Sequence, residues 1–271
     1  MDQYAVVGHP VSHSKSPQIH AMFAEQTRQA ISYSAIEAPL DDFEGVVTTF
    51  FQRGGKGLNV TVPFKEQAWS MCNVLSDRAR LAGAVNTLYL DQYGKLCGDN
   101  TDGYGLVNDL IQQGICLSGK NILIIGAGGA VKGVIQPILN EAPASLTLAN
   151  RTKSKADELV SVFAKQGSIS SLAFEQLSKP FDLVINGTSA SLGGQLPDIS
   201  SAIFSVETVA YDMMYAKGDT VFNVWAKRNG VHTALDGLGM LVEQAAEAFF
   251  IWRGVRPKTR DIIQVLRAAT A

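Results

Sequence analysis

A glycine-rich turn between a buried strand and a helix is the feature that most constrains this chain. Residues 121–125 read N-I-L-I-I, an apolar and mostly β-branched run typical of a strand buried on both faces. Gly126, Gly128 and Gly129 follow, and apolar residues then recur at helical spacing from Val131. This layout suits a dinucleotide pyrophosphate, because backbone N–H groups and the helix dipole can approach the phosphates. The alternative is an ordinary tight turn, which would not need two adjacent glycines.

The end of the next apolar run, residues 145–149, predicts which dinucleotide binds. An NAD-binding unit usually places a carboxylate there for the ribose hydroxyls. The first carboxylate after this run is Asp157, and the run is followed directly by polar or basic residues: Asn150, Arg151, Thr152, Lys153, Ser154 and Lys155. Cations and hydroxyl donors suit a ribose 2′-phosphate, so the sequence predicts NADP rather than NAD. A polar turn in which Thr152 or Ser154 caps the following helix is the alternative.

The composition narrows the classes of protein to which this sequence can belong. The 271 residues are 46% hydrophobic and 18% charged, with a net charge of −2, which argues against a nucleic-acid-binding surface. No segment reaches the roughly 18 apolar residues of a membrane span, and the first residues lack the pattern of a signal peptide. Three widely spaced cysteines predict a reducing cytoplasm without disulfides, and the four histidines show no metal-ligand spacing. We therefore expect no metal, no nucleic acid and no membrane partner.

The pattern of strands and helices predicts an α/β fold with two domains. Strands are expected at 4–7, 31–38 and 58–62, with a hairpin of 84–90 and 96–103, and then at 121–125, 145–149, 181–185, 209–213 and 231–235. The second set alternates with helices, as in a Rossmann-like, doubly wound NADP domain. Helices at 238–252 and 259–268 do not extend this pattern and are expected to return to the first domain. The division is 1–101 for an open mixed α/β substrate domain, 102–236 for the NADP domain and 237–271 for the returning helices.

Two polar loops of the first domain follow strand ends, where ligands bind in open α/β sheets. Ser16 precedes Pro17, which predicts a helix start with Ser16 as its N-cap. Ser14 has no such structural task, so its hydroxyl is the better candidate for a polyol ligand. Thr61 and Lys65 follow the strand at 58–62 and flank the same expected crevice.

The predicted hairpin is rich in ligand-type side chains, among them Asn86 and Asp102. Asp102 precedes a helix, so it is either an N-cap or a carboxylate beside Lys65. A lysine ammonium can supply the proton and the positive charge that the developing alkoxide of a reduced ketone requires. The residues leave open where the proton of this pair rests. Gln244 is either a satisfied core amide or a ligand contact.

The strand ends of the second domain should line the reactive end of the cofactor cleft. Thr188, Met213 and Gly237 stand at three of these ends. Because ligands bind at the carboxyl ends of the strands in such sheets, the three residues are expected to line the nicotinamide end of the cleft.

Several ordered blocks of the sequence resemble the shikimate dehydrogenase family over nearly the whole chain. They are H-S-K-S-P (13–17), N-V-T-V-P-F-K-E (59–66), A-G-A-V-N-T (82–87), G-D-N-T-D-G (98–103), G-A-G-G-A (126–130), N-R-T (150–152), Y-D-M-M-Y (211–215) and D-G-L-G-M-L-V-E-Q-A-A (236–246). The resemblance implies a shikimate-pathway enzyme of aromatic amino acid biosynthesis that reduces 3-dehydroshikimate reversibly with NADPH.

The resemblance also assigns roles to residues. It implies that Lys65 and Asp102 form the catalytic pair. Substrate contacts are implied for Ser14, Ser16, Thr61, Lys65, Asn86, Asp102, Tyr215 and Gln244. Cofactor contacts are implied for Asp77, Gly126, Ala127, Gly128, Gly129, Ala130, Asn150, Arg151, Thr152, Lys155, Thr188, Met213, Gly237 and Met240. Lys132 stands where the family often has arginine, which could alter a phosphate contact, and Gly187 stands where alanine is common.

Two other functions fit parts of the sequence. A quinate/shikimate dehydrogenase able to use NAD is the nearer one, and the acid-free segment at 150–152 argues against it. A non-enzymatic NADP-sensing module would leave Lys65 and Asp102 without a task. The sequence is compatible with a monomer or a homodimer.

Overall fold

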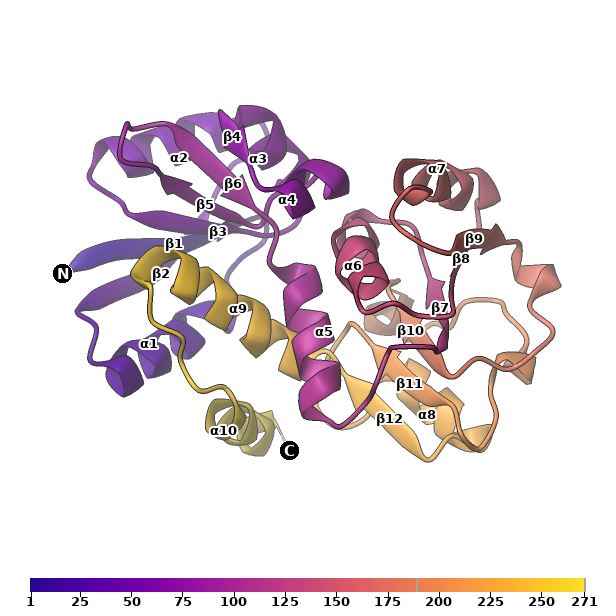
Figure 1. Cartoon of the computed structure of the whole chain (residues 1–271). Helices are drawn as coiled ribbons and strands as arrows, with labels where there is room; N and C mark the ends of the chain where they lie inside the picture. Colours follow the sequence, from indigo (N-terminus) through magenta and orange to yellow (C-terminus); the bar gives the residue numbers. More distant parts are fainter. Residues whose placement is uncertain (189, 271) are drawn as a thin grey trace.

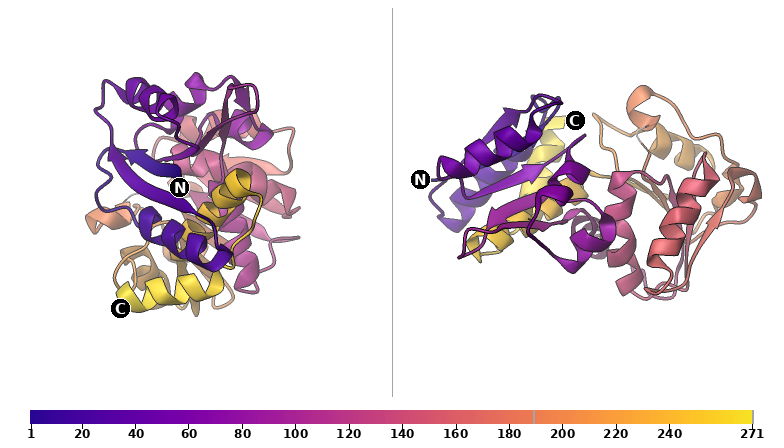
Figure 2. Two further views of the ribbon diagram at one scale, coloured as in Figure 1. Left: turned by 90° about the vertical axis from the view of Figure 1, so that its left-hand side faces the viewer. Right: turned by 90° about the horizontal axis from the view of Figure 1, so that it is seen from above.

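The chain forms two lobes, each built on a six-stranded sheet, with a cleft between them (Figure 1). The structure is a computed structural model and describes residues 1–188 and 190–270. The predicted α/β class with two sheet-based units is confirmed. In the view from above, the early and late parts of the chain share one lobe, and the middle of the chain forms the other (Figure 2).

The first lobe has a mixed sheet in the order β2-β1-β3-β5-β6-β4. Its strands are β1 (Asp2–Gly8), β2 (Ile31–Glu37), β3 (Gly57–Val60), β4 (Val74–Leu75), β5 (Thr87–Leu90) and β6 (Leu96–Asp99). β1 lies parallel to β2 and β3, and β5 runs antiparallel to β3 and β6, so the predicted hairpin is confirmed. The lobe's early helices are α1 (Ser16–Thr27), α2 (Phe43–Gln52), α3 (Lys65–Met71) and α4 (Asp77–Ala82).

The second lobe has an all-parallel sheet in the order β12-β11-β10-β7-β8-β9. Its strands are β7 (Asn121–Ile125), β8 (Ser145–Ala149), β9 (Ile169–Leu172), β10 (Leu183–Asn186), β11 (Val209–Asp212) and β12 (Thr233–Asp236). Its helices include α6 (Gly129–Asn140), α7 (Lys153–Phe163) and α8 (Val221–Arg228), with short 3₁₀ turns at Phe174–Gln176, Ala190–Gly193 and Ser201–Ile203. The strand order reverses between β7 and β10, which is the switch point where doubly wound sheets bind ligands.

Two helices that pack against each other join the lobes. α5 (Asp102–Gln112) stands between the sheets, and α9 (Leu238–Arg253) runs back from the second lobe beneath the first (Figure 1). α9 covers α1 through an apolar cluster that includes Phe23, Val242 and Phe249, and α10 (Arg260–Thr270) adds Leu266. The C-terminal helices therefore pack against α1 of the first lobe.

Three elements were absent from the sequence prediction. α3 spans only seven residues and begins at Lys65, soon after the end of β3. β4 has two residues, and β9 is an edge strand whose sequence, I-S-S-L, is half polar. Strands this short carry too few residues for their periodicity to be recognised.

Candidate active site

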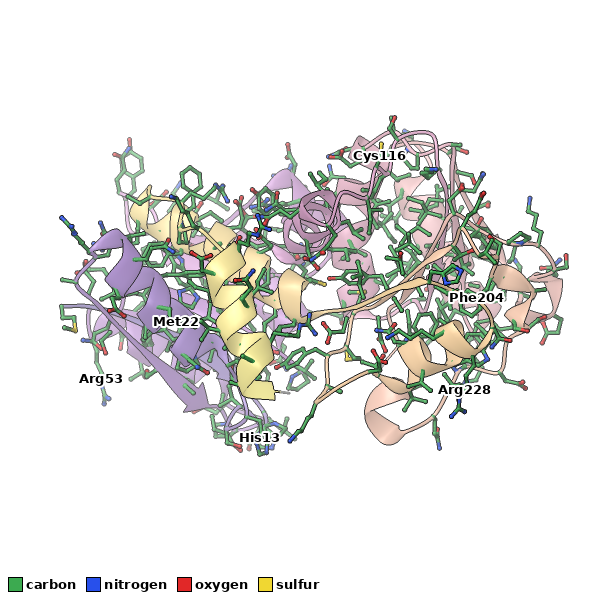
Figure 3. All side chains as sticks on the ribbon, turned by 90° about the horizontal axis from the view of Figure 1, so that it is seen from below. His13, Met22, Arg53, Cys116, Phe204 and Arg228 are labelled. Atoms are coloured by element: carbon green, nitrogen blue, oxygen red, sulfur yellow. The ribbon has the colours of Figure 1, made fainter. Side chains whose placement is uncertain are left out.

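A cleft of about 490 Å³ opens between the carboxyl ends of β1 and β3 and those of β11 and β12. Eleven predicted site residues line it: Ser14, Ser16, Thr61, Lys65, Asn86, Asp102, Met213, Tyr215, Gly237, Met240 and Gln244. His13 also lines the cleft, and its position at the edge of the first lobe is labelled in Figure 3. A surface groove of about 460 Å³ beside α2 contains none of the predicted residues.

Lys65 and Asp102 form an ion pair within this cleft. The Lys65 ammonium donates to Asp102 Oδ2 at 2.5 Å, and both side chains are largely buried. The Asn86 amide donates to the other carboxylate oxygen of Asp102 at 2.8 Å. The sequence offered two roles for Asp102, and the structure supports the carboxylate beside Lys65.

The predicted N-cap role of Ser16 is wrong, and so is the N-cap alternative for Asp102. Lys15 is the N-cap of α1, and Ser16 is the first helical residue; the Ser16 backbone N–H donates to the Ser14 hydroxyl oxygen at 3.2 Å. Thr101 is likewise the N-cap of α5, and its side chain makes no capping bond. In both places the helix begins one residue off the expected position, so Ser14 carries a local structural bond while Asp102 is free to face Lys65.

Tyr215 and Gln244 close the cleft from the second lobe and from α9. Burial raises the pKa of the Tyr215 phenol above its ordinary value, and the charge of Asp236 adds to the shift, so this hydroxyl keeps its proton. The Gln244 amide donates to the Leu241 carbonyl at 2.8 Å while the residue lines the cleft. Its two proposed roles, core amide and cleft residue, are therefore compatible.

The glycine turn leads from β7 into α6. Gly126 has a φ of 116°, which favours glycine, and Ala127 and Ala130 flank the two remaining glycines. A Cβ atom added at Gly128 or Gly129 would meet nothing within 4 Å, and no side chain caps this end of α6. An open backbone surface at a helix N-terminus is what a bound pyrophosphate requires.

The strand ends of the second lobe lie next to one another. A Cβ atom at Gly126 would lie 3.3 Å from the Thr188 methyl group, and one at Gly237 would lie 2.2 Å from the Met213 carbonyl oxygen. Thr188 is oriented by its hydroxyl, which donates to Asn186 Oδ1 at 2.8 Å. A Cβ atom at Gly187, beside Thr188, would lie 3.2 Å from the Met213 sulfur, which links these contacts from the glycine turn to Met213.

The basic segment after β8 is exposed. Arg151 and Lys155 are exposed, Thr152 is the N-cap of α7, and the Asn150 amide donates to the Thr152 carbonyl at 2.9 Å. Thr152 therefore occupies the N-cap position that the alternative predicted for it, although its side chain makes no capping bond. Glycines, a free helix start and a cationic strand end together fit an anionic dinucleotide with a ribose phosphate.

Asp77 lies apart from the residues that line the cleft. It begins α4, which packs against α6, and its exposed carboxylate pairs with Arg80 at 3.2 Å. Lys132, on α6, pairs with Glu66 of the first lobe at 2.9 Å. This bond connects the lobes at the residue beside Lys65, so in this conformation Lys132 serves an inter-lobe contact.

Sequence reasoning gave no role to two further polar residues of the site. Asn59 is only 6% exposed and lines the cleft, and Thr101 donates to the Asn86 side-chain oxygen from both its N–H and its hydroxyl. An asparagine inside an apolar strand was an available signal for Asn59. Thr101 had none, because its role depends on how α5 begins.

Among the described residues, no cluster of three or more histidine, cysteine or acidic side chains is arranged to hold a metal ion. Within the same residues, no helix is long and apolar enough to cross a membrane. Cys72, Cys97 and Cys116 are free thiols, and Figure 3 shows Cys116 at the edge of the second lobe.

Comparison with known proteins gives consistent matches along the chain. A model of the shikimate dehydrogenase substrate-binding domain matches residues 6–88, a shikimate/quinate 5-dehydrogenase model matches 109–193, and a shikimate 5′-dehydrogenase C-terminal-domain model matches 237–267. The shikimate dehydrogenase (NADP⁺) of Hahella chejuensis is 59% identical over 268 residues, which cover 98% of this chain and 99% of the relative.

Solved structures agree in fold. An Ael1 enzyme from Pseudomonas putida has a TM-score of 0.93 and 43% identity, with 98% of each chain covered. Shikimate 5-dehydrogenase from Thermus thermophilus, crystallised with NADP(H) and shikimate, has a TM-score of 0.88 and 33% identity, covering 99% of this chain and all of that one.

A Rossmann-like sheet that faces a buried lysine–carboxylate pair across an inter-lobe cleft defines the class, a two-lobed nucleotide-dependent oxidoreductase. Within that class, the chain belongs to the shikimate dehydrogenase family.

Proposed function

We propose that this protein catalyses the reversible reduction of 3-dehydroshikimate to shikimate with NADPH, in the pathway to aromatic amino acids. The observation that carries the proposal is the Lys65–Asp102 pair at 2.5 Å, placed where the strand ends of both sheets face one cleft. The NADP-dependent relative and the Thermus complex with NADP(H) and shikimate support the choice of cofactor and substrate.

In the proposed reaction the Lys65 ammonium donates a proton to the substrate oxygen as the ketone becomes an alkoxide, and its charge stabilises that oxygen. Asp102 accepts hydrogen bonds from Lys65 and Asn86, so it can hold both the ammonium and the reacting hydroxyl in place. NADPH, when bound, supplies the hydride.

The remaining site assignments follow the geometry of the cleft. We assign the substrate's polar groups to Ser14, Ser16, Thr61, Asn86, Tyr215 and Gln244, all of which line the cleft. We assign the cofactor to the glycine turn at 126–130, the segment 150–155, Thr188, Met213, Gly237 and Met240, with Asp77 at its margin. The domain division at 101 and 236 and a cytoplasmic location, which the three free thiols favour, are part of the same proposal.

The test is the absorbance of reduced nicotinamide with purified protein, shikimate and NADP, with each component omitted in turn. A rise that requires all three is expected. Lys65→Ala should lower turnover by orders of magnitude and leave NADP affinity nearly unchanged, because Lys65 lies in the substrate lobe. Turnover near the wild-type rate would show that Lys65 is not the acid–base group.

The same assay separates the competing functions. Faster turnover with quinate and NAD would identify a quinate/shikimate dehydrogenase. NADP binding without any turnover would identify a sensing module.

A further inference from the structure

A chain of buried hydrogen bonds runs behind the cleft from Tyr33 to Asp102. The Tyr33 hydroxyl donates to Asn59 Oδ1 at 2.7 Å, and the Asn59 amide donates to Thr87 Oγ1 at 3.3 Å. The Thr87 hydroxyl donates to Asn86 Oδ1 at 2.9 Å, and the Asn86 amide donates to Asp102 Oδ1 at 2.8 Å. Asn59 and Thr87 are directly opposed on β3 and β5, so the sheet itself sets the middle of the chain.

The direction of every bond in this chain is fixed. The Asn59 amide also donates to the Asn86 backbone carbonyl at 3.2 Å, which can only accept, so Asn59 Oδ1 must face Tyr33. Tyr33 must then donate. Thr87 accepts from Asn59, and its single proton goes to Asn86. All donors therefore point toward the Asp102 carboxylate, an arrangement in which each bond polarises the next.

Tyr33, the first residue of this chain of hydrogen bonds, keeps its phenol proton over the working pH range. Burial raises the pKa of Tyr33 well above its ordinary value, although a hydrogen bond with Ser16 acts in the opposite direction. The ring stacks on His20 with centroids 4.1 Å apart, and burial lowers the pKa of His20 to about 3. His20 is therefore neutral and places no charge beside the chain.

Neither Tyr33 nor Thr87 is among the residues that line the cleft, and Thr87 is 0% exposed. We propose that Tyr33 and Thr87 are positioning residues, whose hydroxyls hold the Asn86 amide and, through it, the Asp102 carboxylate against Lys65. This inference rests on the proposed function, because it assumes that Asp102 and Lys65 carry the reaction. Two side chains that do not reach the substrate, those of Tyr33 and Thr87, thereby join the residues that determine turnover.

The expected loss of turnover depends on a second hydrogen bond that holds Asn86 in place. The Thr101 backbone N–H also donates to Asn86 Oδ1, at 2.9 Å, so loss of the Thr87 hydroxyl weakens the support without abolishing it. One lost hydrogen bond within a cooperative chain should lower kcat roughly tenfold, well short of the loss expected for Lys65→Ala.

The test compares Thr87→Val, which removes the hydroxyl at nearly constant volume, with Thr87→Ser, which retains it. We expect Thr87→Val to lower kcat about tenfold with the KM for NADP changed less than about twofold, and Thr87→Ser to stay near wild type. Tyr33→Phe breaks the chain at its far end and should lower kcat by a smaller factor, about threefold. If Thr87→Val does not fold, Tyr33→Phe tests the proposal in its place.

Thr147→Val is the matched control, since Thr147 is a buried strand threonine of β8 in the other lobe. Its kcat should equal that of wild type, and thermal unfolding of all variants separates stability from turnover. The inference is overturned if Thr87→Val and Thr87→Ser have equal kcat, or if Thr147→Val loses as much as Thr87→Val. Absence of turnover in the wild type would instead refute the proposed function.

Discussion

Replacing Gly103 by alanine should lower both the turnover and the stability of the protein. Gly103 follows Asp102 in the first turn of α5, where this helix crosses α6. An added Cβ atom would lie 2.4 Å from the Gly133 carbonyl oxygen and 2.4 Å from Cγ of Pro137. A backbone carbonyl and a proline ring cannot rotate away. The start of α5 must therefore move.

The displacement can be worked from these distances. Ordinary contact begins at 3.4 Å, so the shift needed is 3.4 − 2.4, or 1.0 Å. A shift of that size at Asp102 would lengthen its 2.5 Å bond to Lys65 beyond hydrogen-bonding range. Misplacement by about 1 Å can cost about 100-fold in rate. Overpacking costs about 1–3 kcal/mol of unfolding free energy, of which the better helix propensity of alanine offsets up to about 1 kcal/mol.

The assay is kcat at saturating shikimate and NADP, with thermal unfolding measured on the same samples. Gly167→Ala is the control, because the atoms nearest to a Cβ atom there belong to the flexible Leu139 side chain, at 3.2 Å or more. It should leave kcat unchanged. A Gly103→Ala protein that unfolds earlier but turns over within twofold of wild type would refute the idea that this crossing sets the position of Asp102.

Two further predictions concern the cleft and the helix junction behind it. Ser14→Ala should raise the KM for shikimate more than it changes NADP binding, because Ser14 lines the cleft beside the first-lobe residues; an unchanged KM would remove it from the site. Burial raises the pKa of Asp109, while its hydrogen bond from Tyr211 at 2.7 Å acts in the opposite direction. A raised folded-state pKa gives stability at low pH that is lost as the pH rises through that pKa. The stability of Asp109→Asn relative to that of wild type should therefore increase between pH 4.5 and pH 8. The asparagine can still accept the hydrogen bond from Tyr211. Urea unfolding at both pH values checks this, and a pH-independent difference would contradict it.

The sequence predicts the second lobe better than the first. Residues 121–125 and 145–149 are strands with the expected bounds, since both are continuous apolar runs closed by polar residues. Lys65 and Asp102 meet as expected because each follows a strand end of the same sheet. The cap assignments at Ser16 and Asp102 failed by one residue, since the first turn of a helix tolerates several polar residues and only the backbone angles decide which of them is the cap.

The hydrogen bonds that hold the catalytic pair in place could not be predicted from the sequence in the same way. Tyr33, Asn59 and Thr87 come from three strands, and nothing in their local sequence indicates that their side chains meet. Hydrogen bonds between distant segments depend on register and on side-chain rotamers, which periodicity does not encode. The inter-lobe pair of Lys132 and Glu66 belongs to the same class, because its two residues lie in different lobes.

The return of α9 to the first lobe bears on how the protein is made. During vectorial synthesis the ribosome releases residues 121–236, the whole second sheet, before the helix that covers Ile19 and Phe23 of α1 exists. We expect the second lobe to fold first, and the first lobe to complete its folding only after the last segment of the chain has been synthesised. A chain truncated after Asp236 should then show a protease-resistant second lobe and a cleavable α1. Equal resistance of both would show that the first lobe matures without α9.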